Sequence, residues 1–439
     1  MLLSVWLAKE RSLALSPTDP KWFRRRGYLH FDLPIGPRKA ASIVTAPSKV
    51  ARHAFYPLLN YSITAEKVAK DGSSKKLIIK EKHRPIAYAA HVDAHIYAYY
   101  SEQLTNAYEA QLAKRNLGDV VLAFRSLGKS NIDFAKQAFK AISNFGECGV
   151  VALDISGFFD NINHQILKEK WASLLGTKQL PADHYNVFKS ITQHASVDRD
   201  EVYRCFGISK HNPKHDRYRI CSSKDFRTVV RGGKLINKNR SGKGIPQGSP
   251  ISALLSNIYL IDFDEKVKTQ VDWIGGLYYR YCDDMLLIVP ESSKDAMEAE
   301  VIKLITALKV EINKKKTEVV TFRYKGTRLL ANRPLQYLGF LFDGEQITIR
   351  SAALARYSQR MKRAVRRAKM TKLKRNRIKI ASGQQRKPLY KRKLFEKYSH
   401  LGKRNFIRYG LRAAEKMESA AIKRQLKPLW QRLQDEIDK

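Results

Sequence analysis

The chain has 439 residues, enough for two or three domains with a large buried core. Its 82 Lys and Arg residues outnumber 41 Asp and Glu residues, and the resulting formal net charge of +41 indicates a polyanionic partner. The sequence contains no run of 18 apolar residues and no CxxC pair among its four cysteines. This argues against a membrane-spanning helix or a disulfide framework and fits a reducing cytoplasm.

The predicted elements mix helices and strands along the whole chain. In order they are a mixed region (1–70), two short strands around a turn (76–80 and 84–88), a helix (91–112), an apolar strand (149–153), a helix (166–175), a basic polar stretch (198–243), a Gly/Pro loop (244–252), a helix (253–266), a hairpin (277–289), a helix (294–308), two short strands (near 319 and 338) and a helical tail beyond 350. Antiparallel strands with helices beside them define an α+β fold class.

Two adjacent carboxylates, Asp283 and Asp284, stand between the aromatic and apolar strands of the predicted hairpin. A third carboxylate, Asp154, ends the apolar strand 149–153. Like charges held together need a cation, and Mg²⁺ prefers oxygen ligands. Carboxylates at neighbouring strand ends suit two-metal phosphoryl transfer. An isolated Asp-Asp pair is more often a solvated turn, so this prediction depends on the motifs around it.

Five motifs follow one another along the chain. They occupy residues 154–160 (DISGFFD), 244–252 (GIPQGSPIS), 281–284 (YCDD), 312–317 (INKKKT) and 337–340 (YLGF). In this order and spacing the set resembles the reverse transcriptases. It is most similar to the bacterial group II intron-like branch, and within it to the defence-associated (antiphage) enzymes. The resemblance covers roughly residues 76–345.

The resemblance implies a right-hand polymerase with fingers, palm and thumb. The expected domains are the N-terminal part of the fingers (1–148), the palm with an inserted fingers segment near 185–250 (149–344), and a basic helical thumb (345–439). The thumb prediction has support of its own, because residues 345–439 hold 29 Lys and Arg against 7 Asp and Glu. A solvated face normally mixes signs, so contact with a nucleic-acid backbone is the favoured interpretation.

The same resemblance assigns the catalytic and metal-binding residues. Asp154 and Asp283 are expected to bind both metal ions, with the carbonyl of Ile155 as a further ligand. Asp284 is expected to bind more weakly or only to support them, because adjacent residues tend to point apart. Lys316 matches a lysine suspected of protonating the pyrophosphate leaving group, with an ordinary surface lysine as an equal alternative.

The resemblance also assigns the nucleotide-binding residues. Arg84, together with Lys82, is expected to grip the triphosphate, and forked charge-assisted contacts suit Arg at such a place. Phe159 falls where the family places the ring that excludes a ribose 2′-hydroxyl, although simple core packing also explains it. Gln247 offers donors to the nucleotide, and Gly248 lets a base lie against bare backbone.

A further motif is expected to hold the growing 3′ end. Tyr337, Leu338 and Gly339 resemble the primer grip, with a core hairpin as the alternative. The segment before Lys316 carries Lys309-Val310-Glu311 where many relatives have a glycine turn, a departure that loosens the Lys316 assignment.

Taken together, the resemblance implies an RNA-directed DNA polymerase that extends a 3′-OH with dNTPs on an RNA template. Two Mg²⁺ ions are the expected cofactors, with Mn²⁺ able to substitute. The expected setting is antiviral defence in the bacterial cytoplasm, with a structured noncoding RNA as partner. Two alternatives stay open: template-independent or protein-primed DNA synthesis, and a non-catalytic RNA-binding maturase or chaperone. A zinc site at Cys205, His211, His215 and Cys221 is disfavoured against RNA contact by the same stretch.

Overall fold

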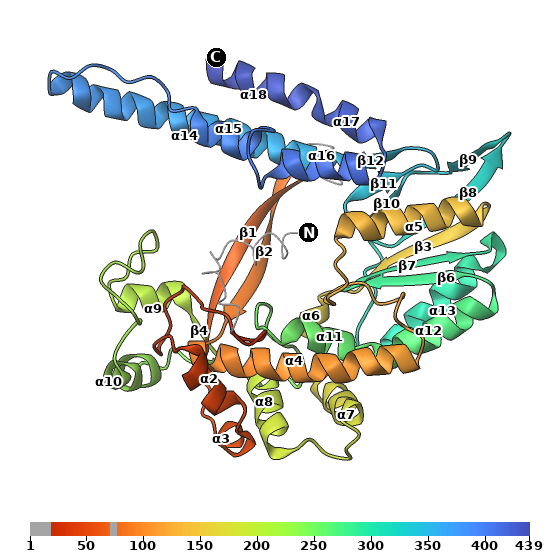
Figure 1. Ribbon diagram of the computed structural model, residues 1–439, viewed down its shortest axis with the longest axis horizontal. Helices are drawn as coiled ribbons and strands as arrows, with labels where there is room; N and C mark the ends of the chain where they lie inside the picture. The colour runs from red at the N-terminus through yellow and green to blue at the C-terminus, as the bar shows by residue number, and fades with distance from the viewer. Residues whose placement is uncertain (1–18, 71–76) are drawn as a thin grey trace.

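The computed structural model describes residues 19–70 and 77–439, and within its strands the side chains of 65–70, 77–80 and 82 lie outside that description. Figure 1 shows a sheet with flanking helices on the right, long helices across the top, and a tall two-stranded ribbon between the lower helices and the upper ones. This mixture of helices and antiparallel strands confirms the expected α+β fold class.

The central sheet has the strand order β6-β7-β3-β8-β9. Its strands are β3 (Cys148–Asp154), β6 (Leu277–Tyr281), β7 (Asp284–Val289), β8 (Glu318–Lys325) and β9 (Arg328–Ala331). β3 pairs antiparallel with both β7 and β8, and all seven of its residues are buried. Val151 and Leu153 enter one hydrophobic core, whereas Val150 and Ala152 enter a second core shared with the C-terminal helices. A strand covered on both faces therefore reads as a continuous apolar run.

The helices divide between the two faces of this sheet and the lower part of the molecule. Before β3 they are α2 (Pro37–Val44), α3 (Pro47–Ala51), α4 (His91–Lys114) and α5 (Asn131–Phe145). After it come α6 (Phe158–Asn161), α7 (His164–Leu174), α8 (Ala182–Thr192), α9 (Arg199–Cys205), α10 (Ser223–Asp225), the π-helical turn Phe226–Arg231, α11 (Ser252–Tyr259), α12 (Ile261–Trp273), the 3₁₀ turn Glu291–Ser293 and α13 (Lys294–Ala307). The single helix expected at 253–266 is thus two helices, α11 and α12, divided at Leu260.

A second sheet has the order β2-β1-β4-β5. Its strands are β1 (Leu58–Lys70), β2 (Leu77–Tyr88), β4 (Ala195–Asp198) and β5 (Asn237–Lys238). The expectation of two short strands at 76–80 and 84–88 was wrong, because β2 is one continuous strand paired along its length with β1. Pro85 does not interrupt β2, since this strand lies at the edge of the sheet, where a missing N–H is tolerated.

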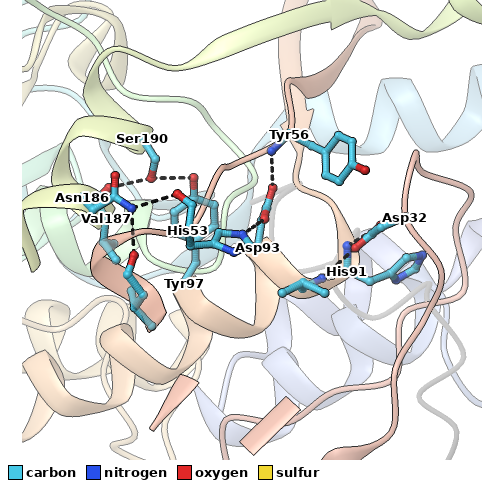
Figure 2. Close-up of polar contacts among 11 residues, drawn as sticks. Asp32, His53, Tyr56, His91, Asp93, Tyr97, Asn186, Val187 and Ser190 are labelled. Carbon is cyan, nitrogen blue, oxygen red and sulfur yellow. Dashed lines mark hydrogen bonds and ion pairs between the residues drawn. The ribbon is translucent and has the colours of Figure 1, made fainter. Parts of the chain in front are cut away.

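Buried carboxylates tie the segments before β1 to helix α4, as Figure 2 shows. Asp32 accepts hydrogen bonds from the backbone N–H of His91, at 2.9 Å, and of the next residue, and so caps a helix start that has no side-chain cap of its own. Asp93, which is 1% exposed, accepts the N–H of Tyr56 at 2.9 Å and lies 2.7 Å from Nε2 of His53. These contacts fix the position from which β1 departs.

The C-terminal part combines a small sheet with five helices. The sheet contains β10 (Leu335–Tyr337), β11 (Phe340–Phe342) and β12 (Ile347–Ile349), and the helices are α14 (Ser351–Ala381), α15 (Arg392–Tyr398), α16 (Phe406–Lys416), α17 (Ala420–Leu426) and α18 (Pro428–Asp438). Tyr357, Met361 and Val365 form a buried stripe on α14, as their spacing predicts. None of the described helices combines the length and apolarity that a bilayer crossing needs.

Candidate active site

Three carboxylates meet where β3 and β7 end side by side. The register pairs Asp154 directly with Asp284, so their side chains leave the same face of the sheet with Cβ atoms roughly 5 Å apart. Asp283 occupies the turn just before β7, and the N–H of Ile155 donates to its carbonyl at 3.2 Å. Residues 129 positions apart in the chain are brought together by these pairings. Asp284, expected to play the weaker part, is the one that directly opposes Asp154.

The turn that carries Asp283 is conformationally demanding. Tyr281 and Asp284 pair across it, which leaves a two-residue loop, and Cys282 at its first position has φ +62°. Tight hairpin turns need a positive φ at this position, where Gly is the favoured residue, so a cysteine there is strained. Non-glycine residues in this conformation persist only where surrounding contacts hold them.

The contact that holds this turn comes from Arg280, which sequence reasoning missed. Arg280 and Asp264 of α12 are both completely buried and form a two-pronged ion pair. The same guanidinium donates to Oδ1 of Asn257 at 3.0 Å and to the carbonyl of Cys282 at 3.1 Å. Burial lowers the pKa of Arg280, but the charge of the Asp264 carboxylate and its hydrogen bonds raise it. The net effect is a raised pKa, so the guanidinium stays charged. The available signal was an arginine inside an otherwise aromatic strand.

The carboxylates repel one another strongly. Burial, followed by the charges of Asp283 and Asp154, raises the pKa of Asp284 to about 7. Among the described residues no three His, Cys, Asp or Glu side chains are posed around one point as ligands, either here or at the Cys205–Cys221 stretch. The donor chemistry nevertheless fits a divalent cation, because the groups are all oxygen ligands whose repulsion a cation would relieve.

Lys316 does reach the carboxylates, despite the unusual turn before it. Lys309 adopts φ +57°, a conformation for which glycine is the favoured residue, so the turn forms without a glycine. The next segment is then attached to the end of β3, since the N–H of Asn313 donates to the Asp154 carbonyl at 2.7 Å. Lys316 Nζ in turn donates to Oδ1 of Asp154 at 2.5 Å, with half of its side chain exposed.

The loop at 244–252 connects two parts of the site. The N–H of Ala87 in β2 donates to the carbonyl of Gln247 at 2.8 Å, and the N–H of Ile245 donates to that of Phe159 at 2.8 Å. Gly248 has φ +110°, and a Cβ there would lie 2.6 Å from the Ala87 carbonyl oxygen. The glycine is therefore required by contact with β2, a reason that the sequence did not indicate. Phe159 is half-buried and packs on the main core beside this loop.

Arg84, one of the nucleotide-gripping residues predicted in β2, lies near the C-terminal helix α14. Arg84 is half-exposed, and the side chain of Lys82 lies outside the described residues. Burial, with the charges of Arg350, Arg360 and Arg84, lowers the pKa of Arg356 on α14. The ribbon β1–β2 thus brings Arg84 close to three arginines at the start of α14, in agreement with the path of the ribbon in Figure 1. Such a group of like charges favours an anion.

The predicted primer grip is a sharp turn next to the carboxylates. Leu338 and Gly339 connect β10 to β11 with φ of +46° and +96°. Asn131 at the start of α5 donates to the Leu338 carbonyl at 3.1 Å. Tyr337 is buried, and burial together with the charge of Asp284 raises the pKa of its hydroxyl. This interaction places the turn and the carboxylates in one neighbourhood.

Comparison with known structures identified fungal telomerases. Apo telomerase from Candida tropicalis truncated from its C-terminal domain is 12% identical, with a TM-score of 0.39, over 66% of this chain and 57% of the telomerase chain. Telomerase from Candida albicans, solved with the TWJ fragment of telomeric RNA, is 12% identical, with a TM-score of 0.38, over 91% and 64%. The chain therefore spans less than two thirds of the telomerases that it matches. No curated protein matches it.

Comparison with models of protein families identifies the family of this chain. The model of the reverse transcriptase (RNA-dependent DNA polymerase) family matches residues 69–342, well over half of the chain. That range includes β2 of the ribbon, the central sheet with its carboxylates, and the turn between β10 and β11, whereas β1 lies almost entirely before it. The chain belongs to the reverse transcriptase family and has the right-hand polymerase fold.

Proposed function

We propose that this chain is an RNA-directed DNA polymerase that extends a primer 3′-OH with dNTPs on an RNA template. The observation that carries this proposal is the register that sets Asp154 against Asp284, with Asp283 in the adjoining turn. A partly buried set of mutually repelling carboxylates destabilises a fold unless a cation relieves the repulsion. A protein that only binds nucleic acid does not need such a set.

Each site residue has a definite part in this proposal. Asp154, Asp283 and Asp284, with the Ile155 carbonyl, would hold two Mg²⁺ or Mn²⁺ ions, which stabilise the attacking and leaving oxygens of phosphoryl transfer when bound. Lys316, already hydrogen-bonded at this site, supplies a proton to the departing pyrophosphate.

The surrounding residues orient the nucleotide and the primer. Phe159 presents a ring beneath the sugar and excludes a 2′-hydroxyl, and Gln247 contacts the incoming nucleotide. Arg84 and Lys82 bind its triphosphate, while the turn of residues 337–339 supports the primer end. These assignments follow the family resemblance. They are supported by the backbone hydrogen bonds that tie the loop 244–252 to β2 and to Phe159, and by the influence of Asp284 on Tyr337.

The proposed template is part of a structured noncoding RNA, in a bacterial antiviral system of the group II intron-like branch that works in the cytoplasm. The support is electrostatic: the segment 345–439 carries 29 Lys and Arg against 7 Asp and Glu, and α14 holds seven of its 15 arginines, six of them exposed. Template-independent or protein-primed synthesis is the second candidate for the same carboxylates. A maturase or chaperone role would use the basic surface alone.

Primer extension on a heteropolymeric RNA template tests the proposal. Asp154→Asn and Asp283→Asn should each lower incorporation by about 10³-fold or more while leaving RNA affinity unchanged, because the two residues hold the reacting atoms rather than the template. Asp272→Asn, at a half-exposed carboxylate on α12, is the matched control and should keep wild-type activity. Product sequence that ignores the template would establish untemplated synthesis instead. Full activity in either site variant would overturn the proposal.

A further inference from the structure

A basic segment projects from the lower left of the molecule in Figure 1, around α9 and α10. We call residues 206–240 the basic insertion. Between it and the half-exposed Leu33 lies a groove of about 440 Å³. Its lining includes Phe206, Arg217, Tyr218 and Arg219 together with the acids Asp216 and Asp225. Nothing in the polymerase mechanism described above uses this groove.

The basic insertion has a large excess of positive charge. It contains ten Lys and Arg residues against only two acids, Asp216 and Asp225. Both acids already have partners: Asp225 accepts from the hydroxyl of Ser222 in a capping box, and Asp216 lies 2.8 Å from His215. The hydrogen bond from Ser222, followed by smaller contributions that include the charge of Arg219, lowers the pKa of Asp225. Neither Arg217 nor Arg219 forms an ion pair with a carboxylate in the part of the chain that the structure describes. An anionic ligand would complete their interactions.

The groove is built on a firm base. Ile220 is buried in the hydrophobic cluster beneath the second sheet, and its N–H donates to the carbonyl of His30 at 2.9 Å. Asp216, at φ +55°, turns the chain just before the run of exposed residues. Between these two fixed points Tyr218 is 83% exposed, with an arginine on each side. One of them, Arg217, donates to the Phe206 carbonyl at 3.2 Å.

A large aromatic side chain between two arginines has the chemistry of a stacking platform for nucleic acid. The ring offers a flat face to a base, and the guanidinium groups bind the flanking phosphates. A base inside a duplex hides both of its faces, so only an unpaired base can use such a ring. We propose that this groove binds an unpaired nucleotide of an RNA strand, stacked on Tyr218 and held by Arg217 and Arg219.

The inference rests on the proposed function for the choice of RNA as the polyanion. It goes further because it specifies what part of the RNA is recognised and by which residues. A single-stranded segment bound here would hold the RNA at a point separate from the carboxylates. Loss of the site should therefore weaken capture of RNAs with unpaired segments and leave catalysis on a short template intact.

The test uses the full chain and two labelled RNA hairpins, one blunt and one with an unpaired tail of about six nucleotides. Tyr218→Ala should weaken binding of the tailed hairpin about tenfold at physiological salt and leave binding of the blunt hairpin unchanged. Tyr218→Phe should bind like the wild type, because stacking uses the ring and not the hydroxyl. Tyr324→Ala, at a half-exposed tyrosine on β8 of the central sheet, is the matched control and should also be unaffected.

A 2-aminopurine base in the tail gives a second measurement. Its fluorescence should be quenched on binding to the wild type and to Tyr218→Phe, and not on binding to Tyr218→Ala. Equal affinities of wild type and Tyr218→Ala for the tailed hairpin, or equal losses on both hairpins, would overturn the inference. Primer extension by the wild type separates the two proposals: extension without any tail preference refutes only this inference, whereas tail-dependent quenching without extension refutes only the polymerase function.

Discussion

Replacing Arg280 with Met tests whether the buried ion pair supports the catalytic turn. The change removes a guanidinium that makes four hydrogen bonds, two of them to Asp264, and leaves a fully buried carboxylate without its counter-charge. Breaking a buried pair in this way destabilises a protein by about 3–5 kcal/mol. Since natural domains are stable by only about 5–15 kcal/mol, the expected loss is a large fraction of the free energy of unfolding.

Urea unfolding followed by tryptophan fluorescence measures this loss. The double variant Arg280→Met/Asp264→Leu should recover most of it, because no charge is then left in the core. Arg199→Met is the matched control: its partner Asp200 is about one-third exposed, so the expected change is below about 1 kcal/mol.

Primer-extension activity separates the two functions of Arg280, which are to stabilise the fold and to position the turn that carries Asp283. The stable double variant still lacks the bond from Arg280 to the Cys282 carbonyl, so the strained turn loses a support and primer extension should remain slow. Stability of Arg280→Met within about 1 kcal/mol of wild type would show that the pair is not needed by the fold. Full polymerase activity in the double variant would show that Arg280 does not position the turn.

Three more predictions follow from single sites. Gly248→Ala should lower the free energy of unfolding by at least about 2 kcal/mol, because its Cβ would collide with β2, whereas Gly242→Ala, also at positive φ but with open space around it, should lose about 1 kcal/mol or less in the same urea measurement. Burial lowers the pKa of His30 from 6.5 to about 3, so the unfolded chain takes up a proton below pH 6.5 that the folded chain does not. Stability should fall by up to about 1.4 kcal/mol per pH unit as pH drops through this window, and His30→Leu should flatten the dependence; an unchanged slope would contradict the assignment. Lys316→Ala should slow single-turnover incorporation about 10²-fold without changing dNTP affinity, while the exposed neighbour Lys315 should tolerate Ala; equal effects would remove Lys316 from the chemistry.

The sequence predicted the fold class, and its pattern located the central sheet well. β3 is apolar at almost every position because both of its faces are covered, and the carboxylate at its end was recognisable for that reason. β1 was missed although part of it alternates polar and apolar residues, the pattern of a half-buried strand. Its pairing with β4 joins Leu58 to Ser196, a contact that no local pattern reveals. The domain boundaries at 148 and 344 remain predictions.

Within the site, motifs identified residues but not always the reason for them. Gly248 was assigned to close approach by a base, and the structure shows close approach by Ala87. The segment Lys309-Val310-Glu311 loosened the assignment of Lys316, yet Lys309 adopts the positive φ that a glycine turn needs. Arg280 was read only as part of a strand, because its partner Asp264 lies on a helix whose orientation depends on tertiary packing.

The position of β3 in the central sheet constrains the order in which a growing chain can fold. β3 is complete at Asp154, but its neighbours β7 and β8 end at Val289 and Lys325. During synthesis more than 130 further residues must be added before either edge of this largely apolar strand can pair. At translation rates of about 5–20 residues per second this exposure lasts several seconds or longer. A ribosome-bound or truncated chain that ends before β7 therefore exposes an unpaired, aggregation-prone strand edge. We expect such a chain to depend on chaperones in a way that the finished molecule does not.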